Sequence, residues 1–111
     1  MTWHPLTDPS QLDILREESH QHPVLILKHS TRCSISSTAL NRLERQWKAA
    51  EVGTLKPYFL DLIAHRAVSN AVAESFGVPH ESPQVLLIQQ GECVYDASHL
   101  AISFADLRAR V

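Results

Sequence analysis

One cysteine stands among residues whose types suit thiol chemistry. Cys33 lies in the run KHSTRCSIS (28–36), between an apolar segment typical of a strand and a segment with helical spacing. A thiol at such a strand-to-helix turn faces the unpaired backbone N–H groups of the helix, which favour its anion. Because the thiolate is the reactive form of cysteine, this position predicts a working thiol.

The spacing after Cys33 predicts a mechanism with a single thiol. Residues 33–36 form a Cys-x-x-Ser sequence, so Ser36 stands where a Cys-x-x-Cys redox pair has its second cysteine. No disulfide can form within this motif, and exchange by one thiolate needs only ionisation and access. Cys93 falls on a predicted edge strand, and we interpret it as a small half-buried apolar side chain rather than a resolving thiol.

The neighbours of Cys33 each have two interpretations. Arg32 and Lys28 either stabilise a thiolate or contact the carboxylates of an adduct, or they are solvated surface charges. His29 either tunes the thiol or packs at the end of the strand, and packing is favoured. Ser36 lies one helical turn beyond Cys33, so it either bonds to the thiolate or belongs to an ordinary N-terminal turn.

Helical spacing of apolar residues recurs in four segments, which would place Cys33 at the start of the longest one. Gly53 and Gly77 stand where two of these segments are expected to stop, since glycine readily ends a helix. The predicted helices cover about residues 9–20, 33–51 and 64–76, and the last lies around 100–107.

Short apolar runs predict strands between these helices. Pro57 has no N–H to donate, so the strand that contains it is expected to begin after it. A tight turn at 90–92 joins the last two strands as an antiparallel hairpin, and the alternation elsewhere implies parallel pairs. The predicted strands lie at 24–27, 58–63, 84–89 and 93–95, with a short extended piece at 3–6. We therefore expect an α/β fold with a small mixed sheet flanked by helices on both faces.

Composition excludes several other classes of protein. The 111 residues, 44% hydrophobic and 20% charged, suit a single globular domain over 1–111. A net charge of −2 and three glycines speak against nucleic-acid binding and against a loop that cradles phosphate. No pair of residues has the spacing of a closed metal site. With no leader-like start and no apolar run of about 20 residues, we expect a cytoplasmic protein without a membrane anchor.

The order of the predicted elements resembles the thioredoxin fold. In that fold, the proline before the penultimate strand is cis and faces the active thiol, and Pro83 matches its position. A closer resemblance is to the monothiol bacilliredoxin family, thioredoxin-like stress proteins of bacteria that use bacillithiol. It is carried by KHSTRCSIS together with Ser82-Pro83-Gln84 and Ala97-Ser98-His99. The usual motif of that family is Thr-Cys-Pro-Ile-Ser, whereas here Arg32 precedes Cys33 and Ser34 takes the place of the proline.

The resemblance implies an activity and a set of partners. Cys33 would remove bacillithiol from protein mixed disulfides, with bacillithiol as co-substrate and no bound cofactor or metal. The expected partners are bacillithiolated client proteins and a low-molecular-weight thiol. An alternative is a glutaredoxin-like module that holds an iron–sulfur cluster or a partner without turnover. Ser98 and His99 lie where glutaredoxin-like proteins bind a carboxylate, or they form a helix cap. The residues implied to contact substrate are Arg32, Ser36, Ser82, Pro83, Ser98 and His99.

Overall fold

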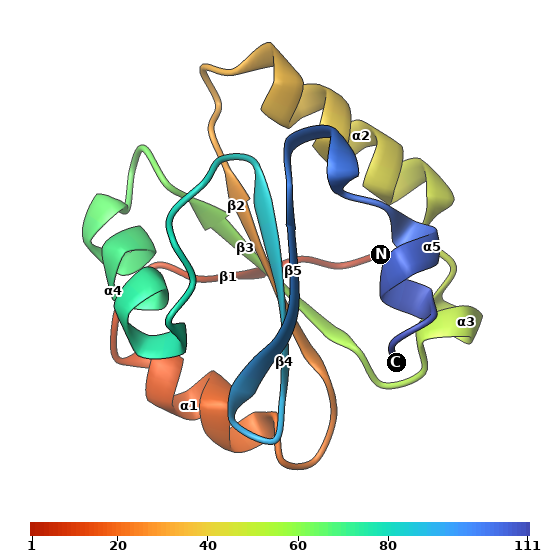
Figure 1. The fold of residues 1–111 in the computed structure, drawn as a ribbon, viewed down its shortest axis with the longest axis horizontal. Helices are drawn as coiled ribbons and strands as arrows, with labels where there is room; N and C mark the ends of the chain where they lie inside the picture. Colours follow the sequence, from red (N-terminus) through yellow and green to blue (C-terminus); the bar gives the residue numbers. More distant parts are fainter.

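A mixed sheet of five strands runs through the middle of the protein (Figure 1). The computed structural model describes residues 1–111. The strand order is β1-β3-β2-β4-β5; β1, β3 and β2 are parallel, while β4 and β5 form the predicted antiparallel hairpin. The strands are β1 (His4–Pro5), β2 (Val24–His29), β3 (Lys56–Asp61), β4 (Gln84–Gln89) and β5 (Glu92–Ser98).

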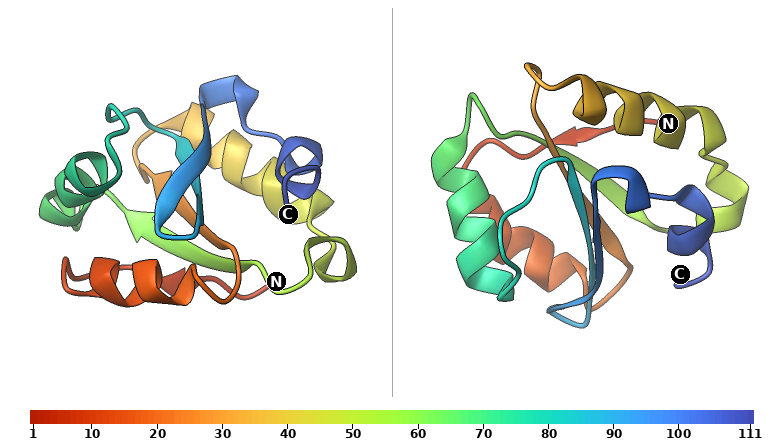
Figure 2. Two further views of the ribbon diagram at one scale, coloured as in Figure 1. Left: turned by 60° about the horizontal axis from the view of Figure 1, so that its bottom comes forward. Right: turned by 45° about the horizontal axis from the view of Figure 1, so that its top comes forward.

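Helices cover both faces of this sheet, as predicted (Figures 1 and 2). One face carries α1 (Gln11–Glu18) and α4 (Arg66–Phe76). The other carries α2 (Ser34–Gln46), α3 (Ala49–Val52) and α5 (Phe104–Arg108), and the 3₁₀ turn η1 (His99–Ala101) follows β5. None of these helices has the length and apolar character that a membrane crossing requires.

The two faces have separate apolar cores because side chains alternate along a strand. Val24 and Ile26 of β2 belong to a cluster of 12 buried residues with α1 and α4. Leu25 and Leu27 belong to a second cluster of 12 with α2, α3 and α5. We call these clusters the α4-side core and the α2-side core.

The prediction of one continuous helix over 33–51 is wrong. The helix ends at Gln46, and Trp47 and Lys48 have extended backbone with ψ of 126° and 108° before α3 begins. The Trp47 ring packs against Trp3 and Phe104, with ring centroids 6.3 and 5.5 Å apart. The break therefore accompanies an aromatic contact between three distant segments of the chain.

The prediction that β3 begins after Pro57 is also wrong, since the strand begins at Lys56. Backbone N–H groups point alternately to the two sides of a strand. The N–H of Lys56 donates to Pro23 O on the β2 side, so the nitrogen of Pro57 faces the β1 side. There β1 pairs only with Tyr58 and Phe59, so no donor is required of Pro57.

Strand β5 is longer than the predicted 93–95 and takes in part of the cluster interpreted as a helix cap. Its register shifts because Leu87 pairs with Tyr95 whereas Ile88 pairs with Cys93, which leaves Val94 as the extra residue of a β-bulge. Cys93 consequently packs on the α4-side core, while Tyr95 packs on the α2-side core.

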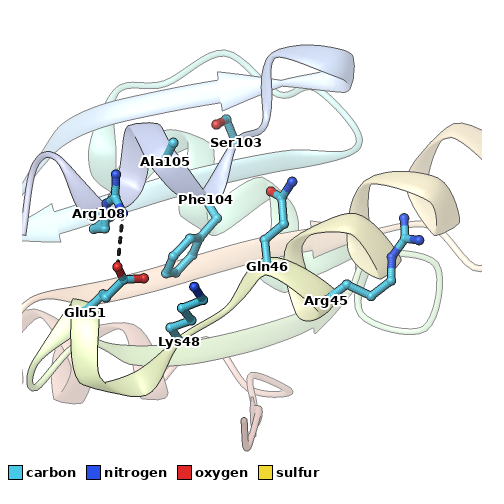
Figure 3. Close-up of a pocket in the computed structure, with 8 residues that line it drawn as sticks. All are labelled: Arg45, Gln46, Lys48, Glu51, Ser103, Phe104, Ala105 and Arg108. Carbon is cyan, nitrogen blue, oxygen red and sulfur yellow. Dashed lines mark hydrogen bonds and ion pairs between the residues drawn. The ribbon is translucent and has the colours of Figure 1, made fainter.

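A hollow of about 450 Å³ lies between the end of α2, α3 and α5 (Figure 3). An ion pair between Arg108 Nη1 and Glu51 Oε1, at 3.1 Å, ties α5 to α3 across it. Because α2 has 13 residues, its far end is about 20 Å from Cys33. This hollow is therefore separate from the cysteine loop.

Candidate active site

Cys33 is the N-cap residue of α2. Its backbone is extended, with φ of −115° and ψ of 120°. Its N–H donates to Ser30 O at 3.2 Å and its carbonyl accepts from Ser37 N at 3.1 Å, which closes the turn. The side chain makes no capping hydrogen bond and is partly exposed. The thiol is thus left free at the head of a long helix.

Three loops meet at the end of the sheet that carries Cys33. Lys28 pairs with Gln84, and Gln84 pairs with Ser98, so the segments that adjoin these three positions lie at the same end of the sheet. They are the β2–α2 loop, the loop that precedes β4, and η1 (Figure 1). The Ser82–Pro83 peptide bond is cis, as the resemblance implied. Pro83 O accepts a hydrogen bond of 2.9 Å from His99 N, which joins two of the loops directly.

Side chains hold η1 in place on both sides. His99 Nε2 lies 3.0 Å from Glu81 Oε2, across the loop of Pro83. On the other side, Arg42 of α2 donates to Leu100 O at 3.2 Å and also to Ile102 O. The position of η1 is therefore set by α2 as well as by the Pro83 loop.

Ser36 and His29 form a buried polar pair beneath the Cys33 turn. Ser36 is fully buried, and its Oγ accepts from Ser30 N at 3.0 Å and lies 2.7 Å from His29 Nδ1. The ring of Phe59 packs on the His29 ring, with centroids 5.4 Å apart. Burial lowers the pKa of His29, which keeps the imidazole neutral at pH 7. Of the two interpretations of Ser36, the structure shows the one in which its hydroxyl belongs to the turn at the start of the helix, with Ser30 N and His29 Nδ1 as its partners.

Lys28 lies on the opposite face of the sheet and is fully buried, so its interpretation as a solvated surface charge is wrong. Its Nζ donates to Ser69 O of α4 at 3.2 Å and lies 3.2 Å from His80 Nδ1. Ser69 Oγ also lies 3.2 Å from the same nitrogen. Burial lowers the pKa of Lys28 to about 8. Burial first, and then the charge of Lys28, lower the pKa of His80.

Comparisons with known proteins agree with this geometry. The family model described as Monothiol bacilliredoxin BrxC matches residues 4–107. The chain belongs to the monothiol bacilliredoxin family. A structure described as that of a candidate oxidoreductase with a thioredoxin fold is 30% identical to this bacilliredoxin, with a TM-score of 0.80 over 95% of this chain and 89% of that one. Together the family and this structure support a thiol-oxidoreductase role.

Two thioredoxins show the same fold at lower identity. The thioredoxin of Trypanosoma brucei brucei is 12% identical to the bacilliredoxin, with a TM-score of 0.76 over 98% of this chain and 88% of that one. The thioredoxin of Fasciola hepatica is 17% identical, with a TM-score of 0.70 over 96% and 94%. These likenesses confirm the predicted thioredoxin fold of the bacilliredoxin.

The other predicted contact residues lie in the three loops at this end of the sheet. Arg32 is exposed and forms no ion pair with a carboxylate. Pro83 is buried, and Ser82 is partly exposed although its Oγ is buried without a hydrogen-bond partner. Ser98 ends β5 and is partly exposed, and His99 is exposed beside it. The two sulfurs are kept apart, because Cys93 packs on the α4-side core and α2 packs on the other face.

Three residues that shape the Pro83 loop were not predicted from the sequence. Gln84 is buried, donates through Nε2 to Pro79 O at 3.1 Å and accepts through Oε1 from Glu81 N at 3.4 Å. His80 contacts Lys28, and Glu81 contacts His99, as described above. A signal existed only for Gln84, a polar residue that opens an otherwise apolar strand run.

Proposed function

We propose that this bacilliredoxin removes bacillithiol from protein mixed disulfides through Cys33. The observation that carries the proposal is the free thiol at the head of α2, at the edge where the Pro83 loop and η1 meet. Unpaired amides at a helix N-terminus favour an anion there. Ser36 in place of a second cysteine supports exchange by one thiol.

The reaction consists of two exchanges of one S–S bond each. The Cys33 thiolate attacks the bacillithiol sulfur of the client mixed disulfide. A new S–S bond joins Cys33 to bacillithiol, and the client cysteine leaves as a thiolate that takes a proton from water. A second free thiol then attacks the bacillithiol sulfur of this adduct. That step restores the Cys33 thiolate and carries bacillithiol away in a soluble disulfide.

Groups around Cys33 are suited to an adduct that carries carboxylates. Arg32 is an exposed cation next to the sulfur with no carboxylate partner of its own. A guanidinium binds a carboxylate through two parallel hydrogen bonds. Ser98, which ends β5, is partly exposed and supplies a hydroxyl group at the same end of the sheet, whereas the Ser82 hydroxyl is buried and would have to turn outward to reach an adduct. We assign the binding of bacillithiol to these residues and the covalent step to Cys33.

The test uses a client protein that carries bacillithiol on one cysteine. Incubation with Cys93→Ser should release the client and leave a mixed-disulfide mass increase on the protein. Cys33→Ser should release no client, because no thiolate remains at the N-terminus of α2. Arg32→Gln should raise KM several-fold with a smaller change in kcat, since it removes a binding contact.

Two results contradict the proposal. One is a wild-type protein that leaves the client fully modified in the presence of excess thiol. The other is client release that continues in Cys33→Ser and stops in Cys93→Ser, which would show that Cys93 carries out the exchange. Mass spectrometry of the client and of the bacilliredoxin at each time point distinguishes these results.

A further inference from the structure

Strand β2 ends in two polar residues whose side chains leave the sheet in opposite directions. His29 points into the α2-side core and Lys28 into the α4-side core. We propose that these two residues are positioning residues for disulfide exchange. His29 holds the loop that carries Cys33, and Lys28 holds the loop that carries Pro83, so that the exchange takes place between two fixed loops. The inference rests on the proposed function and names residues that act through other groups rather than on substrate.

His29 holds the loop of Cys33 through Ser36. The Ser36 hydroxyl joins the His29 ring, at 2.7 Å, to the Ser30 amide, at 3.0 Å. Ser30 O in turn accepts from the Cys33 amide at 3.2 Å. Leu62 N also donates to His29 O at 3.0 Å, which fixes the backbone beneath the ring. A short chain of hydrogen bonds therefore runs from the sheet to the residue that carries the sulfur.

Lys28 holds the loop of Pro83 through His80. Its ammonium is shared between Ser69 O on α4 and His80 Nδ1, each at 3.2 Å. His80 lies three residues before Pro83, in a loop whose backbone is also held by Gln84. Since Gln84 pairs with Lys28 in the sheet, the loop is attached to β2 by backbone register as well as by the side chain.

Packing alone does not explain a lysine at this position. The four preceding residues of β2 are buried and apolar, and a methionine would fill the space of Lys28 without a charge. A buried ammonium destabilises a protein unless hydrogen bonds compensate for its lost hydration. Disulfide exchange in contrast needs three sulfurs in line, so small shifts between the two loops reduce the rate.

The experiment compares exchange with a client protein and reaction with a small reagent, in a Cys93→Ser background. Client release requires both loops to be aligned, whereas alkylation of Cys33 by iodoacetamide requires only an accessible thiolate. Lys28→Met and His29→Leu should each lower kcat for client release about tenfold, the effect of one lost hydrogen bond. Alkylation of Cys33 in Lys28→Met should stay within about twofold of the parent protein.

Conservative replacements and a matched control separate positioning from general destabilisation. His29→Asn keeps a polar atom near the place of Nδ1 and should recover most of the kcat lost in His29→Leu. Ile26→Val on the same strand loses core packing without touching either loop, so it should keep the parental kcat. Equal losses of kcat in Ile26→Val and Lys28→Met would overturn the proposal, as would parental kcat in both Lys28→Met and His29→Leu.

Amide hydrogen exchange tests the same inference without any turnover. The Ser30 amide should exchange faster in His29→Leu, and the His99 amide, which donates to Pro83 O, should exchange faster in Lys28→Met. If the parent protein fails to release bacillithiol while these amides respond, the proposed function is wrong and the positioning is correct. Unchanged protection of both amides contradicts the positioning.

Discussion

Ser34 is one of the two residues in which this chain departs from the usual motif of its family, and it lies at a position of the helix that accepts either proline or serine. It is the first helical residue after the N-cap Cys33. Proline is favoured at this position because the N–H of the first helical residue has no partner inside the helix. Serine keeps that N–H, so the head of α2 presents one more amide beside the sulfur.

We expect Ser34→Pro to stabilise the protein by about 0.5–1 kcal/mol. Proline restricts the unfolded chain, and the extended backbone of Cys33 suits a residue before proline. Urea unfolding of both proteins measures the change, with Ser34→Ala as the control for loss of the hydroxyl. A clear loss of stability would show that the Ser34 amide is engaged in the folded protein.

Individual residues of the candidate site can be proposed from the sequence where a short motif marks them. Cys33 and Pro83 follow from their neighbours in sequence, and Arg32 follows from its place beside the thiol. Lys28 and His80 lie 52 positions apart and are joined only through the folded sheet. No local pattern shows that a lysine at the end of an apolar strand is turned inward towards α4, so its burial came only from the structure.

At the scale of elements, the helices and strands that pack by regular alternation were predictable and the interruptions were not. The apolar runs of β2 and β4 form strands where the sequence predicted them, and both strands are buried on their two faces. Gly77 ends α4 with a left-handed backbone, φ of 66°, as expected of a helix stop. The break at Trp47 coincides with ring contacts to Trp3 and Phe104, which are far away in sequence.

Trp47→Ala should lower the free energy of unfolding by about 2 kcal/mol, because it removes partly buried aromatic contacts with Trp3 and Phe104. Gln46→Ala, an exposed neighbour at the end of α2, is the control and should change it by less than about 0.5 kcal/mol. Chemical denaturation checks both values. If the two variants are equally stable, the aromatic contact does not hold α2 and α3 in place.

For the whole molecule, the buried Lys28 predicts how stability depends on pH. Its pKa is about 8 in the folded protein and 10.5 for the ordinary side chain. Between pH 8 and pH 10.5 the unfolded chain binds more protons than the folded protein, so the free energy of unfolding should rise with pH. Below pH 8 the amine is charged in both states, and the cost of burying that charge is fully present. Burial raises the pKa of Cys93, which acts in the opposite direction above about pH 9.

The measurement is therefore the difference in unfolding free energy between wild type and Lys28→Met from pH 7 to pH 9. We expect Lys28→Met to be the more stable protein at pH 7 and the difference to shrink as the pH rises. Lys48→Met, at an exposed lysine without a carboxylate partner, should follow the wild-type profile. A constant difference for Lys28→Met would mean that the amine is hydrated in the folded state.

The bulge at Val94 has a consequence for encounters between copies of the chain. An open sheet border offers unpaired donors and acceptors on which another polypeptide can assemble. In β5 the extra residue increases the local twist and interrupts the regular spacing of these groups. At the opposite border, β1 offers two residues, the second of which is Pro5 and has no N–H. Both borders thus discourage growth of the sheet into a fibre.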